Sequence, residues 1–220
     1  MSEEIPDTSR NKARQPKRRA GEIRFKLLLD ALDSLLVDND IQDVGIYQIA
    51  ERAGVPSASV YHFFPNKEAA LVALAHRHHE ALEALSSLPL PTAPVSWQAL
   101  VSEKIRLSAN YHNEHSATLR LFYGVSMTVE MKSADIRQTL RLAERRLALL
   151  ERYFILAPVP GLLRRLAVAI AIVDGVFGLS YSQHGAVTDE YVEEAQRGAL
   201  AYLRCYLPEV LFVHEASSGS

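Results

Sequence analysis

The sequence predicts an all-α protein. Apolar residues recur at spacings of three and four along most of the 220 residues. Glycine and proline, at ten residues each, fall mainly between these periodic segments. No two alternating segments are joined by an Asn-Gly or Asp-Gly turn, so β-hairpins are not indicated. We expect about nine helices.

Four helices are predicted in the first 85 residues. In residues 22–38 the apolar spacing places one stripe on one helix face. Short helices follow over 46–53 and 58–64, and a longer helix runs from 66 to about 85. Gly54 lies between the two short helices, where a glycine commonly ends a helix.

Five further helices are predicted after a proline-rich linker. Three prolines lie in residues 87–94, which makes this the clearest break in the chain. The expected helices are 97–112, 116–130, 133–155, 162–183 and 189–207. The helix over 162–183 is apolar on nearly all sides, so protein is expected to bury most of its faces.

Charge is distributed unevenly along the chain. Residues 10–26 contain eight basic side chains and one acidic side chain, whereas the whole chain has a net charge of −2. A basic arm on an acidic body suggests a polyanionic partner at one end of the protein. A solvated tail with no partner explains the same pattern, so charge alone leaves both interpretations open.

Composition and motifs exclude several classes of protein. The only cysteine is Cys205, so no intramolecular disulfide can form, which fits a cytoplasmic location. Neither a secretory signal nor an apolar run long enough to span a bilayer is present, so no membrane association is expected. The sequence lacks G-x-S-x-G, P-loop and H-E-x-x-H motifs, and we expect neither enzymatic activity nor a cofactor.

Residues 46–64 have the pattern of a helix-turn-helix. The segments IYQIAERA, GVPS and ASVYHFF read as helix, turn and helix, with Ser57 as the expected N-cap of the second helix. Ser57, Ser59, Tyr61 and His62 are expected to point outward, and such side chains fit a DNA major groove. A plain helical corner with no DNA partner is the alternative that this motif leaves open.

The run IAERAGVPSASVYHFFPNKEAALVAL resembles the DNA-binding domain of the tetracycline-repressor (TetR/AcrR) family of bacterial transcription regulators. The resemblance extends from residue 20 to about residue 80. It implies a three-helix DNA-binding head, a larger ligand-binding body and a homodimer built on the last two helices. It also implies a regulator, expected to be a repressor, that a small effector releases from a palindromic operator of double-stranded DNA. The body resembles nothing that would identify this effector.

The resemblance and the charge pattern together predict the domains and the DNA contacts. The expected parts are a disordered basic arm (1–20), the head (21–85), the ligand-binding and dimerisation domain (95–208) and a disordered tail (209–220). The predicted DNA contacts are Lys17, Arg18, Arg19, Gly45, Ser57, Ala58, Ser59, Tyr61, His62 and Lys67. Gly45 departs from relatives that often have Thr or Ser there, and Phe63 departs from relatives that have His.

Two further sets of residues are predicted in the body. An apolar pocket with a few polar groups is expected to bind a mostly apolar effector. Its predicted lining is Trp97, Tyr111, Arg120, Phe122, Tyr123, Met127 and Arg141. Small residues that allow close helix packing are expected at the dimer interface, namely Gly175, Gly178, Ala195, Gly198 and Ala199.

Two other functions remain open at this point. His76 with His79 and His112 with His115 are i, i+3 pairs that could share a metal, so a metal-sensing regulator of the same fold is one alternative. A helical interaction module that does not bind DNA is the other. Such a module would have no need of a basic arm next to a helix-turn-helix.

Overall fold

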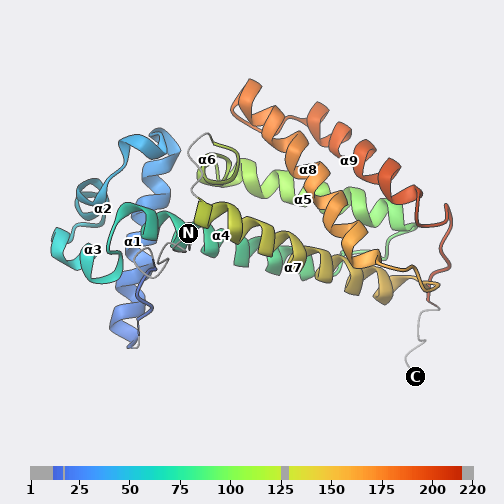
Figure 1. Ribbon diagram of the computed structural model, residues 1–220, viewed down its shortest axis with the longest axis horizontal. Helices are drawn as coiled ribbons and strands as arrows, with labels where there is room; N and C mark the ends of the chain where they lie inside the picture. Colours follow the sequence, from blue (N-terminus) through green and yellow to red (C-terminus); the bar gives the residue numbers. More distant parts are fainter. Residues whose placement is uncertain (1–11, 17, 125–128, 215–220) are drawn as a thin grey trace, which may run out of the picture. The chain divides into compact units, whose positions relative to one another are not determined.

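The computed structural model describes residues 12–16, 18–124 and 129–214. These ranges contain nine α-helices and one 3-10 helix, and their only β pairing is a single bridge, which confirms the predicted all-α class. The helices are α1 (Arg19–Asp38), η2 (Ile41–Asp43), α2 (Ile46–Ala53), α3 (Ser57–Phe63), α4 (Lys67–Ser87), α5 (Trp97–Glu114), α6 (Ala117–Tyr123), α7 (Val129–Tyr153), α8 (Leu162–His184) and α9 (Asp189–Arg204). Figure 1 shows their order along the chain.

The chain divides into two compact units. Unit 1 consists of Met1–His78 and Ser116–Lys132, and unit 2 of His79–His115 and Ser133–Ser220. Helix α6 therefore groups with α1, α2 and α3, although the sequence analysis assigned its segment to the second domain. Helix α4 contributes its first part to unit 1 and its remainder to unit 2.

Unit 1 is built around the apolar stripe of α1. Leu28, Leu32 and Leu36 of this helix are fully buried, as the spacing of four predicts. The ring of Phe25 contacts those of Phe63 and Phe64, with centroid distances of 5.8 and 5.1 Å. These contacts fix α1 against the end of α3 (Figure 1).

The predicted helix-turn-helix is present in α2 and α3. Gly54 has φ +64° and ψ 34°, a left-handed conformation that glycine adopts without steric cost. Helix α3 begins at Ser57 itself, and its N-cap is Pro56, so the predicted capping role of Ser57 is wrong. Asn66 caps α4, because its Oδ1 accepts a hydrogen bond of 2.8 Å from the Ala69 N–H.

Two predicted boundaries in the middle of the chain are corrected. The helix expected over 116–130 ends at Tyr123, because Gly124 leaves the helix with extended backbone angles. Helix α7 begins at Val129, four residues earlier than expected. Residues 125–128, between these helices, lie outside the described ranges.

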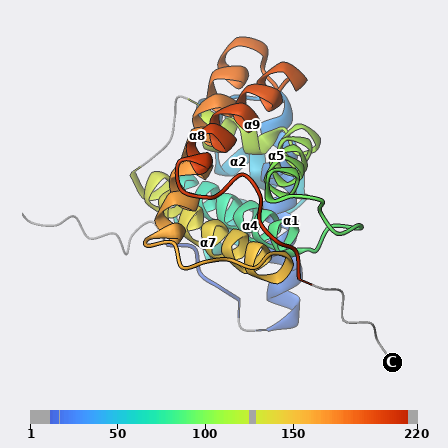
Figure 2. The same ribbon diagram turned by 90° about the vertical axis from the view of Figure 1, so that its right-hand side faces the viewer.

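Unit 2 is a bundle of α5, α7, α8, α9 and the end of α4. Figures 1 and 2 show α8 and α9 running side by side, with α5 and α7 completing the bundle. Leu166 and Phe177 are buried on the inner face of α8. Trp97, at the start of α5, is fully buried, and its Nε1–H donates a 2.9 Å hydrogen bond to the Pro208 carbonyl.

The segment after α9 is hydrogen-bonded to the end of α7 and the residues that follow it. The Ile155 N–H donates to the Phe212 carbonyl at 2.7 Å, and the His214 N–H donates to the Tyr153 carbonyl at 3.0 Å. Phe212 and His214, in the segment expected to be a disordered tail, thus pair with Ile155, just after α7, and with Tyr153, its last residue. Residues 215–220 lie outside the described ranges.

Among the described residues, no helix is both long and apolar enough to cross a membrane.

Candidate nucleic-acid interface and bundle cavity

Helix α3 presents a face to solvent that we call the recognition face, made of Ala58, Tyr61 and His62. All three residues are exposed, and Tyr61 retains 47% of its accessible surface. Val60 and Phe63 point the other way and are buried at 0% and 5% exposure. Tyr61 and His62 are thus exposed as predicted, whereas Ser57 and Ser59, which were also expected to point outward, are half-buried.

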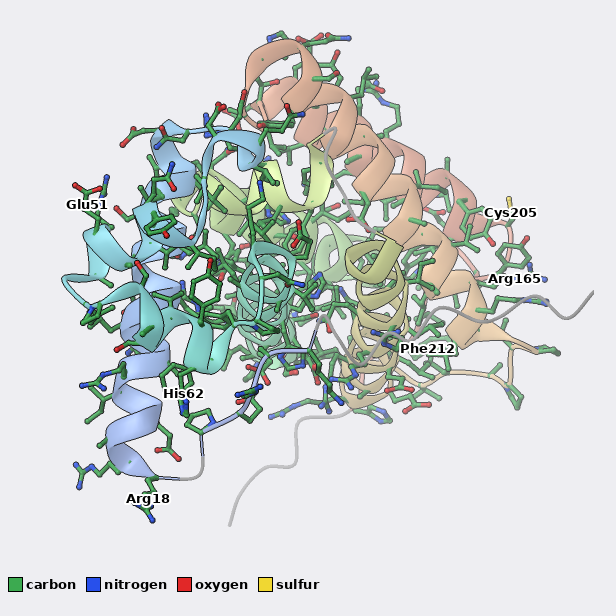
Figure 3. The ribbon with its side chains drawn as sticks, turned by 60° about the vertical axis from the view of Figure 1, so that its left-hand side comes forward. Arg18, Glu51, His62, Arg165, Cys205 and Phe212 are labelled. Carbon is green, nitrogen blue, oxygen red and sulfur yellow. The ribbon has the colours of Figure 1, made fainter. Side chains whose placement is uncertain are left out.

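A groove runs beside the recognition face, between α3 and the first turns of α1. Its lining includes Gly21 and Arg24 from α1 and Ser59 and His62 from α3. Figure 3 shows His62 next to the N-terminal part of α1, with Arg18 at the start of that helix. Arg24 was not among the predicted contacts, although it lies one turn after Ala20, which lines the same groove.

The arm also reaches this region. The Arg14 N–H donates a 2.8 Å hydrogen bond to the carbonyl of Phe63, which places this part of the arm at the end of α3. Arg14, Arg18 and Arg19 are exposed. Lys17 lies outside the described residues, so its predicted contact stays a prediction.

Arg52 and Arg77, two basic residues in the folded helices of the head, are engaged internally. Arg77 Nη1 bonds to Asp30 at 2.5 Å and its Nη2 to Asp33 at 2.8 Å, joining α4 to α1. Arg52 Nη1 donates to the Ser34 hydroxyl at 2.5 Å. These two guanidinium groups hold the head together, so positive charge for an external partner is left to the arm, the start of α1 and Lys67.

Lys67 has a structural role alongside its predicted phosphate contact. Its ammonium donates to the carbonyls of Ile41 and Gln42 at 3.1 and 3.3 Å. An ammonium has three donors, so one hydrogen remains for a phosphate oxygen. Gly45, the N-cap of α2, donates its N–H to Gln48 Oε1 at 3.1 Å and offers no hydroxyl to a partner.

Tyr47 is a candidate contact that the sequence analysis missed. It lies in the first turn of α2 and is 73% exposed. A tyrosine hydroxyl at this helix end can donate to a phosphate. The sequence could have indicated this contact, because Tyr47 is an aromatic residue that does not share the apolar helix face of Ile46 and Ile49, which are both buried.

Unit 2 contains an apolar cavity that we call the bundle cavity, between α5, α7, α8 and α9. Its volume is about 70 Å³, well below the roughly 300–1,000 Å³ of typical ligand pockets. An occupant is therefore small, or the helices separate to admit it. Most of the lining is apolar, and the polar exceptions are Ser108, Arg146 and Asp174.

None of the described residues predicted to bind the effector lines this cavity. Arg120 belongs to unit 1, where its Nη1 donates to the carbonyls of Leu36 and Val37 at 2.7 and 2.9 Å. Its guanidinium thus caps the C-terminal end of α1, and its contact with an effector stays a prediction. Phe122 and Tyr123 follow it on α6, also in unit 1.

The remaining predicted ligand residues have other surroundings in unit 2. The indole N–H of Trp97 bonds to the Pro208 carbonyl, and the ring of Tyr111 contacts that of His115 at a tilt of 43°, with a centroid distance of 4.4 Å. Arg141 is half-exposed and lies 4.0 Å from Glu83. Met127 is outside the described residues.

Replacing Arg120 by methionine is expected to destabilise the protein by about 1.5–3 kcal/mol, the usual contribution of hydrogen bonds to a charged group. The change removes both donors to the end of α1 while keeping a side chain of similar length. Denaturant unfolding measures the effect. Arg141→Met is the control, expected to change stability by about 0–1 kcal/mol because its ion pair is long and exposed. Equal losses in the two variants would contradict the capping role.

The predicted dimer residues divide into two groups. Ala195 and Ala199 are buried within the protomer at 0% and 1% exposure. A Cβ at Gly198 would meet Ile172 Cγ2 at 3.1 Å, so this glycine allows α9 to approach α8. These three residues thus pack within the bundle of one copy, and their place at a dimer interface stays a prediction.

Gly175 belongs to an exposed apolar line along α8, which we call the α8 stripe. It consists of Val168, Ala171, Gly175 and Leu179, at spacings of three and four residues. Val168 and Leu179 are 38% and 51% exposed. Gly178 is partly exposed beside it.

The predicted histidine pairs do not assemble into a larger cluster of metal ligands. Within the part of the chain that the structure describes, no three His, Cys, Asp or Glu side chains are close enough to hold a metal ion. The ring of His112 is buried next to Phe177, with a centroid distance of 6.2 Å.

Comparisons with known proteins agree with this arrangement. The family profile described as bacterial regulatory proteins, tetR family, matches residues 28–74. The profile described as tetracyclin repressor-like, C-terminal domain, matches residues 95–206, just over half of the chain. A search of curated proteins found no match.

Solved structures with the same fold are numerous. A TetR-family transcriptional regulator from Streptomyces coelicolor is 25% identical, with a TM-score of 0.61 over 84% of this chain and 98% of that chain. SmeT, the repressor of the Stenotrophomonas maltophilia multidrug efflux pump SmeDEF, is 19% identical, with a TM-score of 0.60 over 87% of this chain and 91% of its own. The SmeT–triclosan complex is 19% identical, with a TM-score of 0.54 over 90% of this chain and 98% of its own.

Proposed function

The chain belongs to the TetR family of bacterial transcription regulators, and on this premise we propose that it is a homodimeric repressor that a small, mostly apolar effector releases from a palindromic operator. The observation that carries the proposal is the recognition face. Ala58, Tyr61 and His62 are exposed on a helix that Gly54 and Phe63 hold in helix-turn-helix geometry. The basic arm and the start of α1 lie beside this face and supply the charge that phosphate contacts need.

The α8 stripe supports a dimer. A contiguous apolar surface on a helix is a common feature of protein interfaces. A symmetric pair brings the same stripe from both copies together. Two recognition helices then need a separation of about 34–36 Å to enter successive major grooves, which accounts for a palindromic operator.

The bundle cavity supports an effector. SmeT is described as a repressor and has been solved with triclosan, so a similar fold combines repression with small-molecule binding in that protein. In this chain the effector binds the released form more tightly than the DNA-binding form, and this difference in affinity shifts the protein off the operator. A coupling of about 1–3 kcal/mol changes operator affinity by about 5- to 150-fold.

Selection of binding sites from random DNA tests the proposal. We expect an enriched palindrome whose half-sites are centred about one helical turn apart. The enriched site is then placed before a reporter gene, and repression lowers the reporter signal when the protein is present. Recovery of no preferred sequence would contradict DNA recognition, and a raised reporter signal would make the protein an activator.

Substituting Lys17, Arg18 and Arg19 together by alanine is expected to weaken binding to all DNA and to flatten its salt dependence. Each lost phosphate contact reduces the slope of log K against log salt by about 0.9, so the slope falls by up to about 2.7. Tyr61→Ala is expected to weaken binding to the operator while changing that slope by no more than about 0.9, the contribution of one phosphate contact. Fluorescence anisotropy between 50 and 200 mM salt measures both quantities.

A matched charge change in unit 2 is the control for the arm. Arg137, Arg152 and Arg164 are exposed there, and their joint replacement by alanine removes the same charge. This control is expected to keep the wild-type slope. A slope equally reduced in the control, or unchanged in the arm variant, would show that the arm makes no phosphate contact.

A further inference from the structure

The strongest unexplained feature of unit 2 is a pair of basic residues in its interior. Lys104 is 2% exposed, and its ammonium donates to the carbonyls of Leu85, at 3.3 Å, and Leu88. Arg146 comes next to it from α7, with its Nη2 donating to the Lys104 carbonyl at 3.5 Å. These two cations lie where most of the surroundings are apolar.

Arg146 has hydrogen-bonding capacity that the protein does not use. Its side chain as a whole is partly buried, but the Nη1 atom is fully buried and has no hydrogen-bond partner among the described residues. A buried donor left without an acceptor costs free energy. Arg146 also lines the bundle cavity, which offers space for an acceptor.

The electrostatics around this guanidinium favour an anion. Burial lowers the pKa of Arg146 to about 10, so it remains protonated at neutral pH. The pKa of Lys104 is lowered to about 8, mainly by burial and next by the charge of Arg146. Asp174, the acidic residue of the cavity lining, is engaged in an interaction of its own.

We propose that the bundle cavity binds an apolar monocarboxylic acid, whose carboxylate accepts hydrogen bonds from the guanidinium of Arg146 and whose hydrocarbon part lies among α5, α7, α8 and α9. This inference rests on the proposed function, because it names the chemical class of the effector. Figure 2 shows the four helices that surround the site.

Several properties of the site favour a carboxylate over other anions. The planar guanidinium fork matches the two oxygens of a carboxylate. A phosphate dianion would bring more charge into a small apolar space, where desolvation is expensive. Apolar side chains such as Leu142, Val173 and Leu203 line most of the cavity and suit a hydrocarbon chain.

Calorimetric titration of the full chain with matched acids and alcohols tests the inference. The probes are butanoate, hexanoate and octanoate, each paired with the straight-chain alcohol of the same length. We expect at least one acid to bind about tenfold or more tightly than its alcohol. Arg146→Met is expected to lower acid affinity by about tenfold or more and to leave the alcohol affinity within about threefold.

Arg145→Met is the matched control. Arg145 precedes Arg146 on α7, but its guanidinium is half-exposed and bonds to Glu83 at 2.6 Å. The control is expected to keep the preference for acids. Arg146→Lys, which retains a cation without the fork, is expected to keep part of that preference.

Thermal unfolding checks that the Arg146 variants are folded. We expect Arg146→Met to melt no lower than wild type when no acid is present, since it removes a buried charge that lacks an acceptor. Such a result excludes misfolding as the cause of lost binding.

Three results would overturn the inference: equal affinity for acid and alcohol, no binding of either at any chain length, or an acid preference that survives Arg146→Met. DNA binding is measured on the same preparations without any acid. Failure there would overturn the proposed function instead, so the two failures are distinguishable.

Discussion

Replacing Gly175 by arginine is expected to convert the proposed dimer into a folded monomer and to lower operator affinity by about 10²–10⁴-fold. An operator with two half-sites binds a dimer through both recognition helices, and loss of the link between them removes the gain from simultaneous binding. This variant tests the α8 stripe as the dimer interface.

The structure indicates that the arginine disturbs only an interface between copies. Gly175 is exposed, and a Cβ added there meets no atom within 4 Å. Its position in the middle of the α8 stripe means that a symmetric dimer would bury two guanidinium groups without acidic partners. Burying an unpaired charge costs several kcal/mol, which exceeds what a few apolar contacts contribute.

Light scattering at micromolar concentration measures the molecular mass, and circular dichroism measures the helix content. Ala148→Arg is the matched control, because Ala148 is exposed on α7 and gains the same side chain. We expect the control to remain a dimer with wild-type operator affinity. A dimeric Gly175→Arg protein would place the interface elsewhere.

Replacing Ala58 by aspartate is expected to lower operator affinity by more than about 100-fold without changing the fold. Ala58 is exposed on the recognition face and lines the groove beside Arg24 and His62. A carboxylate at this position would lie against DNA acceptor groups and phosphates. Like charges brought together at an interface cost several kcal/mol.

Anisotropy with the selected operator measures this effect, and thermal unfolding checks the head. Ala148→Asp adds the same charge in unit 2 and is expected to retain operator binding. Operator affinity of Tyr61→Phe separates the contribution of the hydroxyl from that of the ring, because this change removes only the hydroxyl of an exposed side chain. Wild-type affinity in Ala58→Asp would exclude α3 as the element that enters the major groove.

Much of unit 1 was predictable because its determinants are local in sequence. The stripe with Leu28, Leu32 and Leu36 follows from helical periodicity, and Gly54 takes the left-handed conformation that ends α2. A short-range pattern fixes which side chains of α3 face solvent, since Val60 and Phe63 anchor its other side. The exposure of Tyr61 and His62 could therefore be predicted without tertiary contacts, whereas Ala58 was expected to contact DNA only from the family resemblance.

The sequence by itself thus determined the all-α class and the helix-turn-helix, while tertiary structure decided how several polar and small residues are used. Arg120 caps a helix 84 residues earlier in the chain, and Gly198 makes room for Ile172. Arg146 borders the bundle cavity because α5, α7, α8 and α9 come together around it. Periodicity gives the face of a helix on which a residue lies, but the partner of that face is set by long-range packing, which one sequence does not reveal.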